Sequence, residues 1–437
     1  MAPAAPTDLN EFLKLHPADL ADRMQRLSLE EAQLLLPKLP PTLAAPALGE
    51  LERERQQELL KALPAEKLTP LLSELPANIV ADLVPELPPL ARRTTLGALP
   101  AEQCRRVQAL LRYAPDTAGG LMSDRFIALR EDMTVEEARA LLRAHAQEER
   151  AEDVAYLYVT DTQRRLAGIV SLRDLVFRRA ERRIREIMNR DVKFVRATDD
   201  QESVARQFEH YHYLGLPVTD GEGRLVGLVR ASDALEVAQA EATEDMQLMV
   251  GLSGEERALT PWQVAVRHRL PWLYINLATA FLAAFVVGLF ESTIAKWTAL
   301  AVFLPVIAGQ GGNAGMQTIT VIVRDLALGE ITFSDGRRAL FKELMLGLVN
   351  GVAVGVVVGL VGWWWKDSLT LGVVAFAALV LNQLCAAFVG VAIPFTLKAL
   401  RVDPALASSI FVTTVTDVAG FFFFLGLALL AMRWFGI

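Results

Sequence analysis

Residues 297–323 read WTALAVFLPVIAGQGGNAGMQTITVIV, an apolar run whose centre is rich in glycine and side-chain amides. A helix needs about 20 residues to cross a hydrocarbon core of roughly 30 Å, so this stretch is long enough to span a membrane. Four further apolar stretches of similar length lie near residues 270–290, 342–365, 370–398 and 410–434. The sequence therefore predicts a membrane domain of five helices.

Charge is unevenly distributed along the 437 residues. Residues 1–260 contain 33 Lys/Arg and 43 Asp/Glu, whereas residues 261–437 contain 11 and 8. An acidic, soluble part is thus joined to a part built for lipid, which excludes a plain cytosolic enzyme. Cys104 and Cys385 lie in different parts and exclude a secreted disulfide scaffold. No motif points to catalysis, and no basic patch with interleaved aromatics indicates nucleic acid as a partner.

The Lys/Arg distribution predicts how the five spans are oriented. The first 30 residues contain no apolar segment typical of a signal peptide, so we expect the N-terminal part in the cytosol. With the N-terminus inside, the cytosolic flanks carry eight basic residues and the outer flanks three, in agreement with the positive-inside rule. An odd number of spans then places the C-terminus outside. The cytosolic set is Arg267, Arg269, Arg324, Arg337, Arg338, Lys342, Lys398 and Arg401, and the outer set is Lys296, Lys366 and Arg433.

Glycines recur every four residues in the third span, at Gly347, Gly351, Gly355 and Gly359. Small residues at this spacing allow helices to pack closely. The pattern leaves open whether the partner helix belongs to the same subunit or to a second copy.

Two polar features interrupt the apolar spans. The first is the run from Gly309 to Gln317, whose four glycines are expected to loosen the helix and bring carbonyl and amide oxygens to mid-membrane, as in a pore lining. The alternative is a tight helix crossing, which explains the glycines but not Gln310, Asn313 and Gln317 together. The second feature is Asp417, a carboxylate without Lys or Arg within one helical turn. An ionisable residue in a span is costly and by default suggests a functional site.

These groups are hard oxygen ligands, which suit a hard cation. Mg²⁺ gives up its waters reluctantly and is often held through one or two carboxylates. A ring of one Asp417 per subunit would bind hydrated Mg²⁺ weakly enough to release it, as conduction requires. Spacing alone leaves Mn²⁺, Co²⁺ and Ca²⁺ open.

Leucine recurs every 12 residues from Leu15 to Leu111, and proline follows five of these leucines. Proline disfavours helix in the residue before it and suits the start of the next helix. Each unit therefore predicts one short helix and a turn, stacked into an α-solenoid.

A second repeat follows, with copies at residues 122–180 and 188–240. Val159-Thr-Asp161 returns as Val218-Thr-Asp220, 59 positions later. Each copy predicts strand, helix, strand, turn, strand and helix, and the pair resembles tandem CBS domains. In such domains the pattern Ser171-x-x-Asp174 can hold a ribose, which makes an adenine nucleotide a candidate ligand. The second copy has Arg230 where Ser or Thr is usual.

Residues 199–256 contain 13 Asp/Glu against 3 Arg, directly before the first span. Glu241 lies three and four positions before Glu244 and Asp245, so these carboxylates share a helix face and repel one another. A divalent cation would relieve this repulsion. We interpret the acidic cluster as a cation sensor, with a solvated face as the alternative; its members are Asp233, Glu236, Glu241, Glu244 and Asp245.

These segments, in this order, resemble the MgtE family of magnesium channels over essentially the whole chain. Five motifs carry the resemblance: Phe290-Glu291-Ser292, Pro305 through Gly311-Gly312-Asn313 to Gln317, Val402-Asp403-Pro404-Ala405-Leu406, Thr416-Asp417-Val418-Ala419-Gly420, and Ala240-Glu241-Ala242-Thr243-Glu244-Asp245. The chain departs from the family pattern at Ser409, where Asn is expected, and at Thr413, which replaces a smaller residue.

The resemblance implies a multidomain membrane protein with an N-terminal α-solenoid (1–118), two CBS domains (119–184 and 185–240), a connecting or plug helix (241–266) and five transmembrane helices (267–437). It implies a homodimer of the inner or plasma membrane that conducts Mg²⁺ inward and closes when Mg²⁺ binds its cytosolic domains. Asp417 and Asn313 become pore ligands, and Asp82 joins the sensor acids. Alternatives are a broader divalent-cation or nucleotide-gated transporter, and a membrane-anchored regulatory protein.

Overall fold

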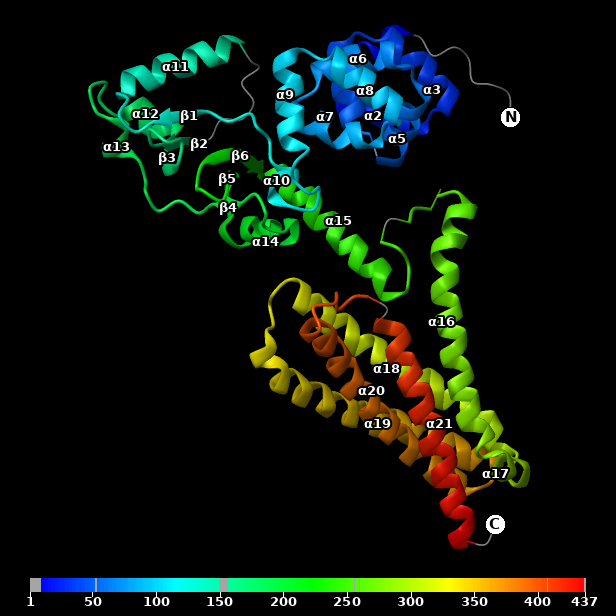
Figure 1. Cartoon of the computed structure of the whole chain (residues 1–437). Helices are drawn as coiled ribbons and strands as arrows, with labels where there is room; N and C mark the ends of the chain where they lie inside the picture. The colour runs from blue at the N-terminus through cyan, green and yellow to red at the C-terminus, as the bar shows by residue number, and fades with distance from the viewer. Residues whose placement is uncertain are drawn as a thin grey trace. The chain divides into compact units, whose positions relative to one another are not determined.

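The computed structural model describes residues 9–51, 53–148, 156–254, 256–258, 260–406 and 408–435. By its internal contacts the chain divides into two compact units, Met1–Ala238 and Gln239–Ile437. Each unit is described by itself (Figure 1).

The first unit begins with a stack of short helices that alternate between two rows. Helices α2, α4, α6 and α8 contact one another in succession, while α3 contacts α5 and α7 contacts α9. One helix thus corresponds to the 12-residue period, and two successive helices form the unit that is stacked. The elements are α1 (Leu9–Phe12), α2 (Pro17–Arg26), α3 (Leu29–Leu35), η1 (Leu36–Lys38), α4 (Pro41–Gly49), α5 (Arg53–Ala62), α6 (Ala65–Glu74), α7 (Ala77–Leu83), η2 (Val84–Glu86), α8 (Pro89–Ala98) and α9 (Ala101–Leu110).

The recurring leucines close one helix and enter the core. Leu75 and Leu87 each adopt an extended backbone at a helix end and are about 2% exposed. Pro76 and Pro88 then occupy the N-cap of the next helix. The proline ends the preceding helix without losing a needed N–H, because a cap residue donates none to the helix. The predicted α-solenoid is confirmed in this unit.

The two repeats that follow form two three-stranded sheets of the same topology. The first strand of each sheet is parallel to the second, and the second is antiparallel to the third. The elements are α10 (Ala118–Leu121), β1 (Ala128–Arg130), α11 (Val135–Glu148), β2 (Tyr156–Thr160), β3 (Leu166–Ser171), α12 (Leu172–Phe177), α13 (Ile184–Ile187), β4 (Val195–Arg196), α14 (Gln201–Tyr211), β5 (Gly215–Thr219), β6 (Leu225–Arg230) and α15 (Ala231–Met249).

Each repeat also completes the sheet of the other. The backbone of Ser123, at the start of the first copy, exchanges two hydrogen bonds of 2.8 and 2.9 Å with Leu228 on β6. The backbone of Asn189, at the start of the second copy, likewise exchanges bonds of 2.8 and 2.9 Å with Ile169 on β3. The copies are therefore interlocked as one pair.

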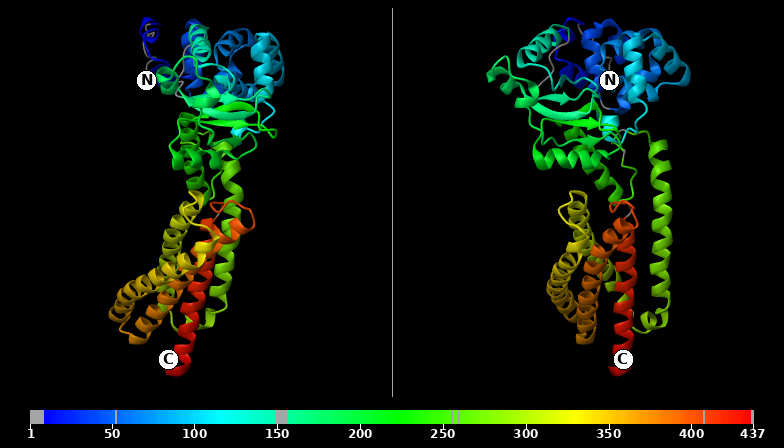
Figure 2. Two further views of the ribbon diagram at one scale, coloured as in Figure 1. Left: turned by 90° about the vertical axis from the view of Figure 1, so that its left-hand side faces the viewer. Right: turned by 60° about the vertical axis from the view of Figure 1, so that its left-hand side comes forward.

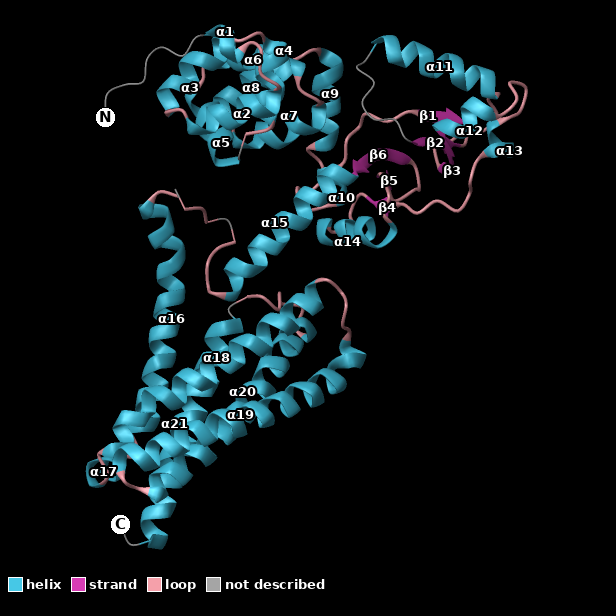
Figure 3. Cartoon of the chain, turned by 180° about the vertical axis from the view of Figure 1, so that it is seen from behind, coloured by secondary structure: helices cyan, strands magenta, loops and turns pink. Residues whose placement is uncertain are grey.

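The second unit is a bundle of long helices, drawn from two further sides in Figure 2 and by secondary structure in Figure 3. Within the described residues, five helices are long and apolar enough to cross a membrane, in agreement with the predicted spans. Helix α20 contacts α18, α19 and α21, while α16 contacts α21. The elements are α16 (Trp262–Gly288), α17 (Glu291–Lys296), α18 (Ala299–Ala327), η3 (Phe333–Asp335), α19 (Gly336–Lys366), α20 (Leu369–Ala399) and α21 (Ser408–Phe435).

The glycine stripe of α19 packs against α20 of the same chain. A Cβ at Gly347 would lie 2.9 Å from the Gln383 carbonyl oxygen, and one at Gly359 would lie 2.9 Å from the Gly372 carbonyl oxygen. Such distances leave no room for a methyl group, so the two backbones approach as closely as glycine allows. Of the two alternatives for this stripe, the structure shows packing within one subunit.

We expect Gly359→Ala to destabilise the bundle, because the added methyl would meet the backbone of α20. Overpacking of this kind costs about 1–3 kcal/mol. Thermal unfolding in detergent measures the effect. Gly426→Ala on α21 is the matched control, because nothing lies within 4 Å of its added Cβ; equal melting temperatures for the two variants would contradict the packing argument.

Candidate ion pathway and cytosolic cation sites

Helix α18 carries the glycine-rich run without a break. It is α-helical from Ala299 to Ala327, so the expectation that the glycines loosen this helix was wrong. Two of its glycines, Gly311 and Gly315, serve close contacts with neighbouring helices. Gly311 and Gly315 are buried, whereas Asn313 and Gln317 are exposed on one face, four residues apart. The amide side chains, rather than loosened backbone, form the polar surface of this span.

Asn382 on α20 explains two of these glycines. Its side chain is fully buried, and its Nδ2 donates a 3.0 Å hydrogen bond to the carbonyl oxygen of Ile307 on α18. A Cβ at Gly311 would overlap that amide, and a Cβ at Gly420 on α21 would lie 2.7 Å from its nitrogen. One side chain therefore sets the spacing of three helices.

Helices α18 and α21 meet where the predicted pore ligands lie. A Cβ at Gly312 would lie 3.8 Å from Thr413, and one at Gly315 would overlap Val412. Asn313 follows Gly312 directly, and Asp417 lies one helical turn beyond Thr413. Asp417 is half-buried, and within the described part of the chain its carboxylate has no hydrogen bond or ion pair. A carboxylate in this state is available to a cation.

Ser409, one of the two departures from the family pattern, bonds to the end of α15. Its hydroxyl donates to the carbonyl oxygen of Met249. Met249 is 8% exposed and packs in an apolar cluster with residues that include Ile319 and Val412. The end of α15 is thus anchored among α18, α20 and α21. The hydroxyl of Thr413, the other departure, bonds to carbonyls of its own helix.

The loop after α15 is tied back by polar contacts. The predicted connecting helix (241–266) is helical only as far as Met249, and α16 begins at Trp262. The Gln247 side chain donates a 2.8 Å hydrogen bond to the Glu256 carbonyl oxygen and accepts one of 3.0 Å from the Glu256 N–H. The Arg269 guanidinium holds the pKa of the Glu256 carboxyl below its ordinary value through a hydrogen bond of 3.0 Å.

The acids at the start of α15 are partly committed to other groups. The Arg230 guanidinium donates hydrogen bonds of 3.1 and 3.2 Å to the two oxygens of the Asp233 carboxylate. Burial raises the pKa of the Glu236 carboxyl, and the nearby carboxylates of Asp233 and Glu50 raise it further. Excess negative charge therefore gathers here between α15 and the end of α4, where a cation would be favoured.

The remaining candidate acids are placed as follows. Glu241, Glu244 and Asp245 lie on the C-terminal half of α15, and Glu244 is against Gly254 in the following loop. Asp82 is exposed on α7. Within the described ranges, no three His, Cys, Asp or Glu side chains gather in a position to hold a metal ion.

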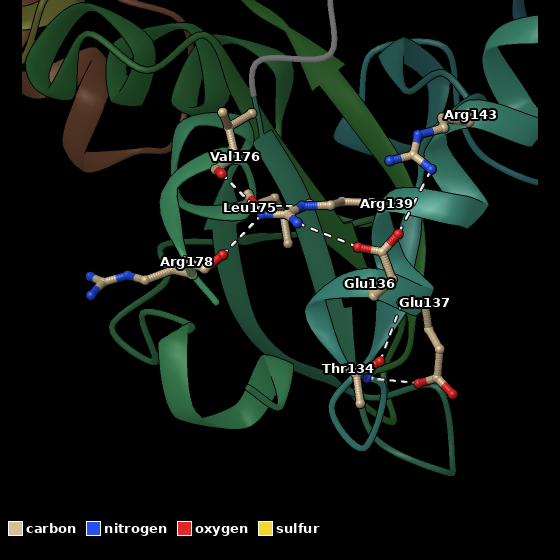
Figure 4. A network of polar contacts seen from close by, with 8 residues as sticks. All are labelled: Thr134, Glu136, Glu137, Arg139, Arg143, Leu175, Val176 and Arg178. Atoms are coloured by element: carbon tan, nitrogen blue, oxygen red, sulfur yellow. Dashed lines mark hydrogen bonds and ion pairs between the residues drawn. The ribbon is translucent and has the colours of Figure 1, made fainter. Parts of the chain in front are cut away.

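Ser171 and Asp174 form a helix cap. The Ser171 hydroxyl donates to the Asp174 carboxylate at 2.6 Å and accepts from the Asp174 N–H at 3.1 Å, at the start of α12. The other end of α12 is held by Arg139, which donates to the carbonyls of Leu175, Val176 and Arg178 (Figure 4). The two residues predicted to bind a nucleotide thus already form hydrogen bonds with each other.

Comparison with known proteins agrees with this arrangement. Residues 15–116 match the model of the MgtE intracellular N domain, residues 118–181 and 184–240 match CBS domains, and residues 304–427 match the MgtE divalent cation transporter domain. The chain is 42% identical over 334 residues to the magnesium transporter MgtE of Thermus thermophilus, covering 75% of this chain and 72% of that one. The chain belongs to the MgtE family.

Other relatives are also transporters by name. The magnesium transporter MgtE of Enterococcus faecalis is 34% identical, covering 77% of this chain and 73% of that one. Among solved structures, the cytosolic domain of the Mg²⁺ channel MgtE in complex with ATP is 40% identical, covers 52% of this chain and 93% of that chain, and aligns with a TM-score of 0.49.

Sequence reasoning missed a buried acid in the membrane unit of this MgtE-family chain. Glu343 on α19 is 5% exposed and accepts a 3.0 Å hydrogen bond from the Thr318 hydroxyl of α18. Its neighbour Lys342, 2.8 Å away, made the pair look like a cytosolic flank. The glycine stripe indicates that Glu343 is buried, because Gly347 lies one helical turn further along the same face of α19.

We expect Asn382→Ala to loosen the crossing of α18, α20 and α21, since it removes the bond to Ile307 and leaves a cavity. Interhelical hydrogen bonds in membranes contribute about 0.6–2 kcal/mol, and the cavity adds to this loss. Thermal unfolding and Mg²⁺ flux should both fall. Asn276→Ala, on an exposed part of α16, is the control; an Asn382→Ala protein as stable as this control would refute the role of the amide.

Proposed function

We propose that this chain forms a homodimeric channel that conducts Mg²⁺ into the cell and is closed by Mg²⁺ on its cytosolic side. The observation that carries the proposal is Asp417, a half-buried carboxylate without a protein partner in the described residues, next to the contact between α18 and α21. The names of the relatives, magnesium transporters, support the choice of ion.

The ligand chemistry supports a hydrated ion. One carboxylate per subunit, with the exposed amides of Asn313 and Gln317 on α18, offers oxygen atoms to the waters of Mg²⁺. A dimer would place two such sets around one axis. Because each subunit supplies a single charge, the ion is held loosely enough to leave again.

The direction of flow follows from the membrane potential. We propose that the N-terminal domains lie in the cytosol and the C-terminus outside. A potential of 100 mV, negative inside, then favours entry of a divalent ion by about 4.6 kcal/mol. Selective conduction therefore needs no coupled energy source.

Closure would act through the end of α15. Met249 packs among α18, α20 and α21, and Ser409 bonds to its carbonyl oxygen. Mg²⁺ bound by acids of α15 and the solenoid (Asp82, Asp233, Glu236, Glu241, Glu244 and Asp245) would hold this helix in place. We propose that the sensor ions bind at the acidic surfaces of the solenoid, the CBS pair and α15.

The alternatives are less well supported. Nucleotide gating would use Ser171 and Asp174, which bond to each other. A purely regulatory membrane anchor would leave the isolated Asp417 without a role. A broader divalent-cation transporter differs from our proposal in selectivity alone.

We expect Asp417→Asn to reduce Mg²⁺ flux by about tenfold or more, because the neutral amide no longer attracts the ion. Fluorescent-dye uptake into proteoliposomes measures the flux, and growth of a host that lacks Mg²⁺ uptake checks it in cells. Asp367→Asn, in the loop between α19 and α20, is the control. Undiminished Mg²⁺ flux in Asp417→Asn would contradict the assignment of Asp417 to the pore.

We expect Ser409→Ala to weaken closure, because the end of α15 loses its hydrogen bond to α21. Channels carrying this change should remain open at Mg²⁺ concentrations several-fold higher than wild type, since one lost hydrogen bond is worth about 0.5–1.5 kcal/mol. Single-channel recording at stepped cytosolic Mg²⁺ measures the shift. Thr414→Val, which loses a bond within its own helix, is the matched control; an equal shift in both variants would speak against a specific anchor.

A further inference from the structure

A polar groove lies between α18, α19 and α20. It has a volume of about 170 Å³, and its polar lining consists of Gln317, Thr318, Lys342, Glu343, Asn350 and Gln383. A space of this size holds several water molecules. So many polar groups are unusual within membrane-spanning helices, where each is costly unless it meets a partner or water.

The anionic group of the groove is Glu343. Its side chain is 6% exposed, whereas that of Lys342 is 58% exposed. One carboxylate oxygen accepts from Thr318 at 3.0 Å and the other is 2.8 Å from the Lys342 ammonium. The carboxylate is therefore fixed by its surroundings, while the lysine is a solvent-facing chain that can swing away.

A second buried side chain of the groove, Gln383, has an oxygen atom without a hydrogen-bond partner in the described residues. Gln383 is 3% exposed, and its Nε2 donates to the Gln310 carbonyl at 3.3 Å. Its Oε1 is buried and has no hydrogen-bond partner in the described residues. Buried amide oxygens are nearly always satisfied, so the Oε1 atom of this groove-lining residue is a candidate ligand for a water or a cation.

The groove is lined on one side by α18, including its polar residue Gln317. Gln317 lines the groove and lies four residues after Asn313, on the same exposed face. An ion that passes Asn313 would thus have a polar route to Glu343. One carboxylate with amide and hydroxyl oxygens is a ligand set that suits Mg²⁺ with several of its waters retained.

We propose that this groove is a second divalent-cation site in the membrane domain, with Glu343 as the anionic ligand and Gln383 Oε1 as a neutral one. When the cation is absent, the Lys342 ammonium pairs with the Glu343 carboxylate, and it competes with the cation for this carboxylate. The inference rests on the proposed function, because the ion reaches the groove from the channel. It concerns a site apart from Asp417.

Mn²⁺ is the probe, and its binding to the full chain in zwitterionic nanodiscs is followed by electron paramagnetic resonance. We expect Glu343→Gln to lose one bound Mn²⁺ per chain, and Lys342→Ala to bind that ion about threefold or more tightly, since a competing charge is removed. Asp417→Asn should keep the Glu343-dependent ion. Glu330→Gln, an exposed acid after α18, is the control.

The outcomes separate the two proposals. If Glu343→Gln and Lys342→Ala both bind Mn²⁺ as wild type does, the groove is a packing feature and the inference fails, whatever Asp417→Asn does to flux. If Asp417→Asn leaves flux unchanged, the channel proposal fails by itself. Should Glu343→Gln unfold, Gln383→Met replaces it: loss of affinity supports the site, and unchanged affinity together with an unchanged Lys342→Ala overturns it.

Discussion

Asn382 occupies the space between two glycines on two different helices, Gly311 of α18 and Gly420 of α21, while bonding to the Ile307 carbonyl. In a bilayer no hydrophobic effect draws apolar helices together, so close backbone contact and a few buried polar bonds determine the packing. The crossing of α18, α20 and α21 depends on this side chain. Asn313 and Asp417 lie two and three residues from those glycines, and their placement follows from the same contact.

The cytosolic charges present a different physical situation. Asp233 is held by Arg230, Glu256 by Arg269, and Asp174 by Ser171. Each of these contacts satisfies a carboxylate locally and reduces its availability to a free cation. The pKa of Glu236, by contrast, is raised by burial and further by the nearby carboxylates of Asp233 and Glu50. A Mg²⁺ sensor on α15 would therefore respond most strongly near Glu236, where repulsion between carboxylates is least compensated by local contacts.

Much of the architecture was predictable from the sequence because it repeats. Leucine and proline at a 12-residue period mark helix ends in any solenoid, and the 59-residue repeat returns at β2 with β5 and at β3 with β6. The five spans follow from length and apolarity. The glycines of α18 were misinterpreted, because glycine both loosens a helix and lets another helix approach, and the sequence does not show which neighbour is present. Glu343 was overlooked because an acid beside a lysine resembles an exposed flank.

Sequence alone predicts the order of the domains, the number of spans and the rarity of charge within them, since these depend on local composition and periodicity. The tertiary structure decided which residues meet. It joined the α19 glycines to α20, the Ser409 hydroxyl to Met249, and Gln383 to the groove at Glu343. These contacts link residues far apart in the chain, and helical periodicity specifies the face of a side chain but not the helix that faces it.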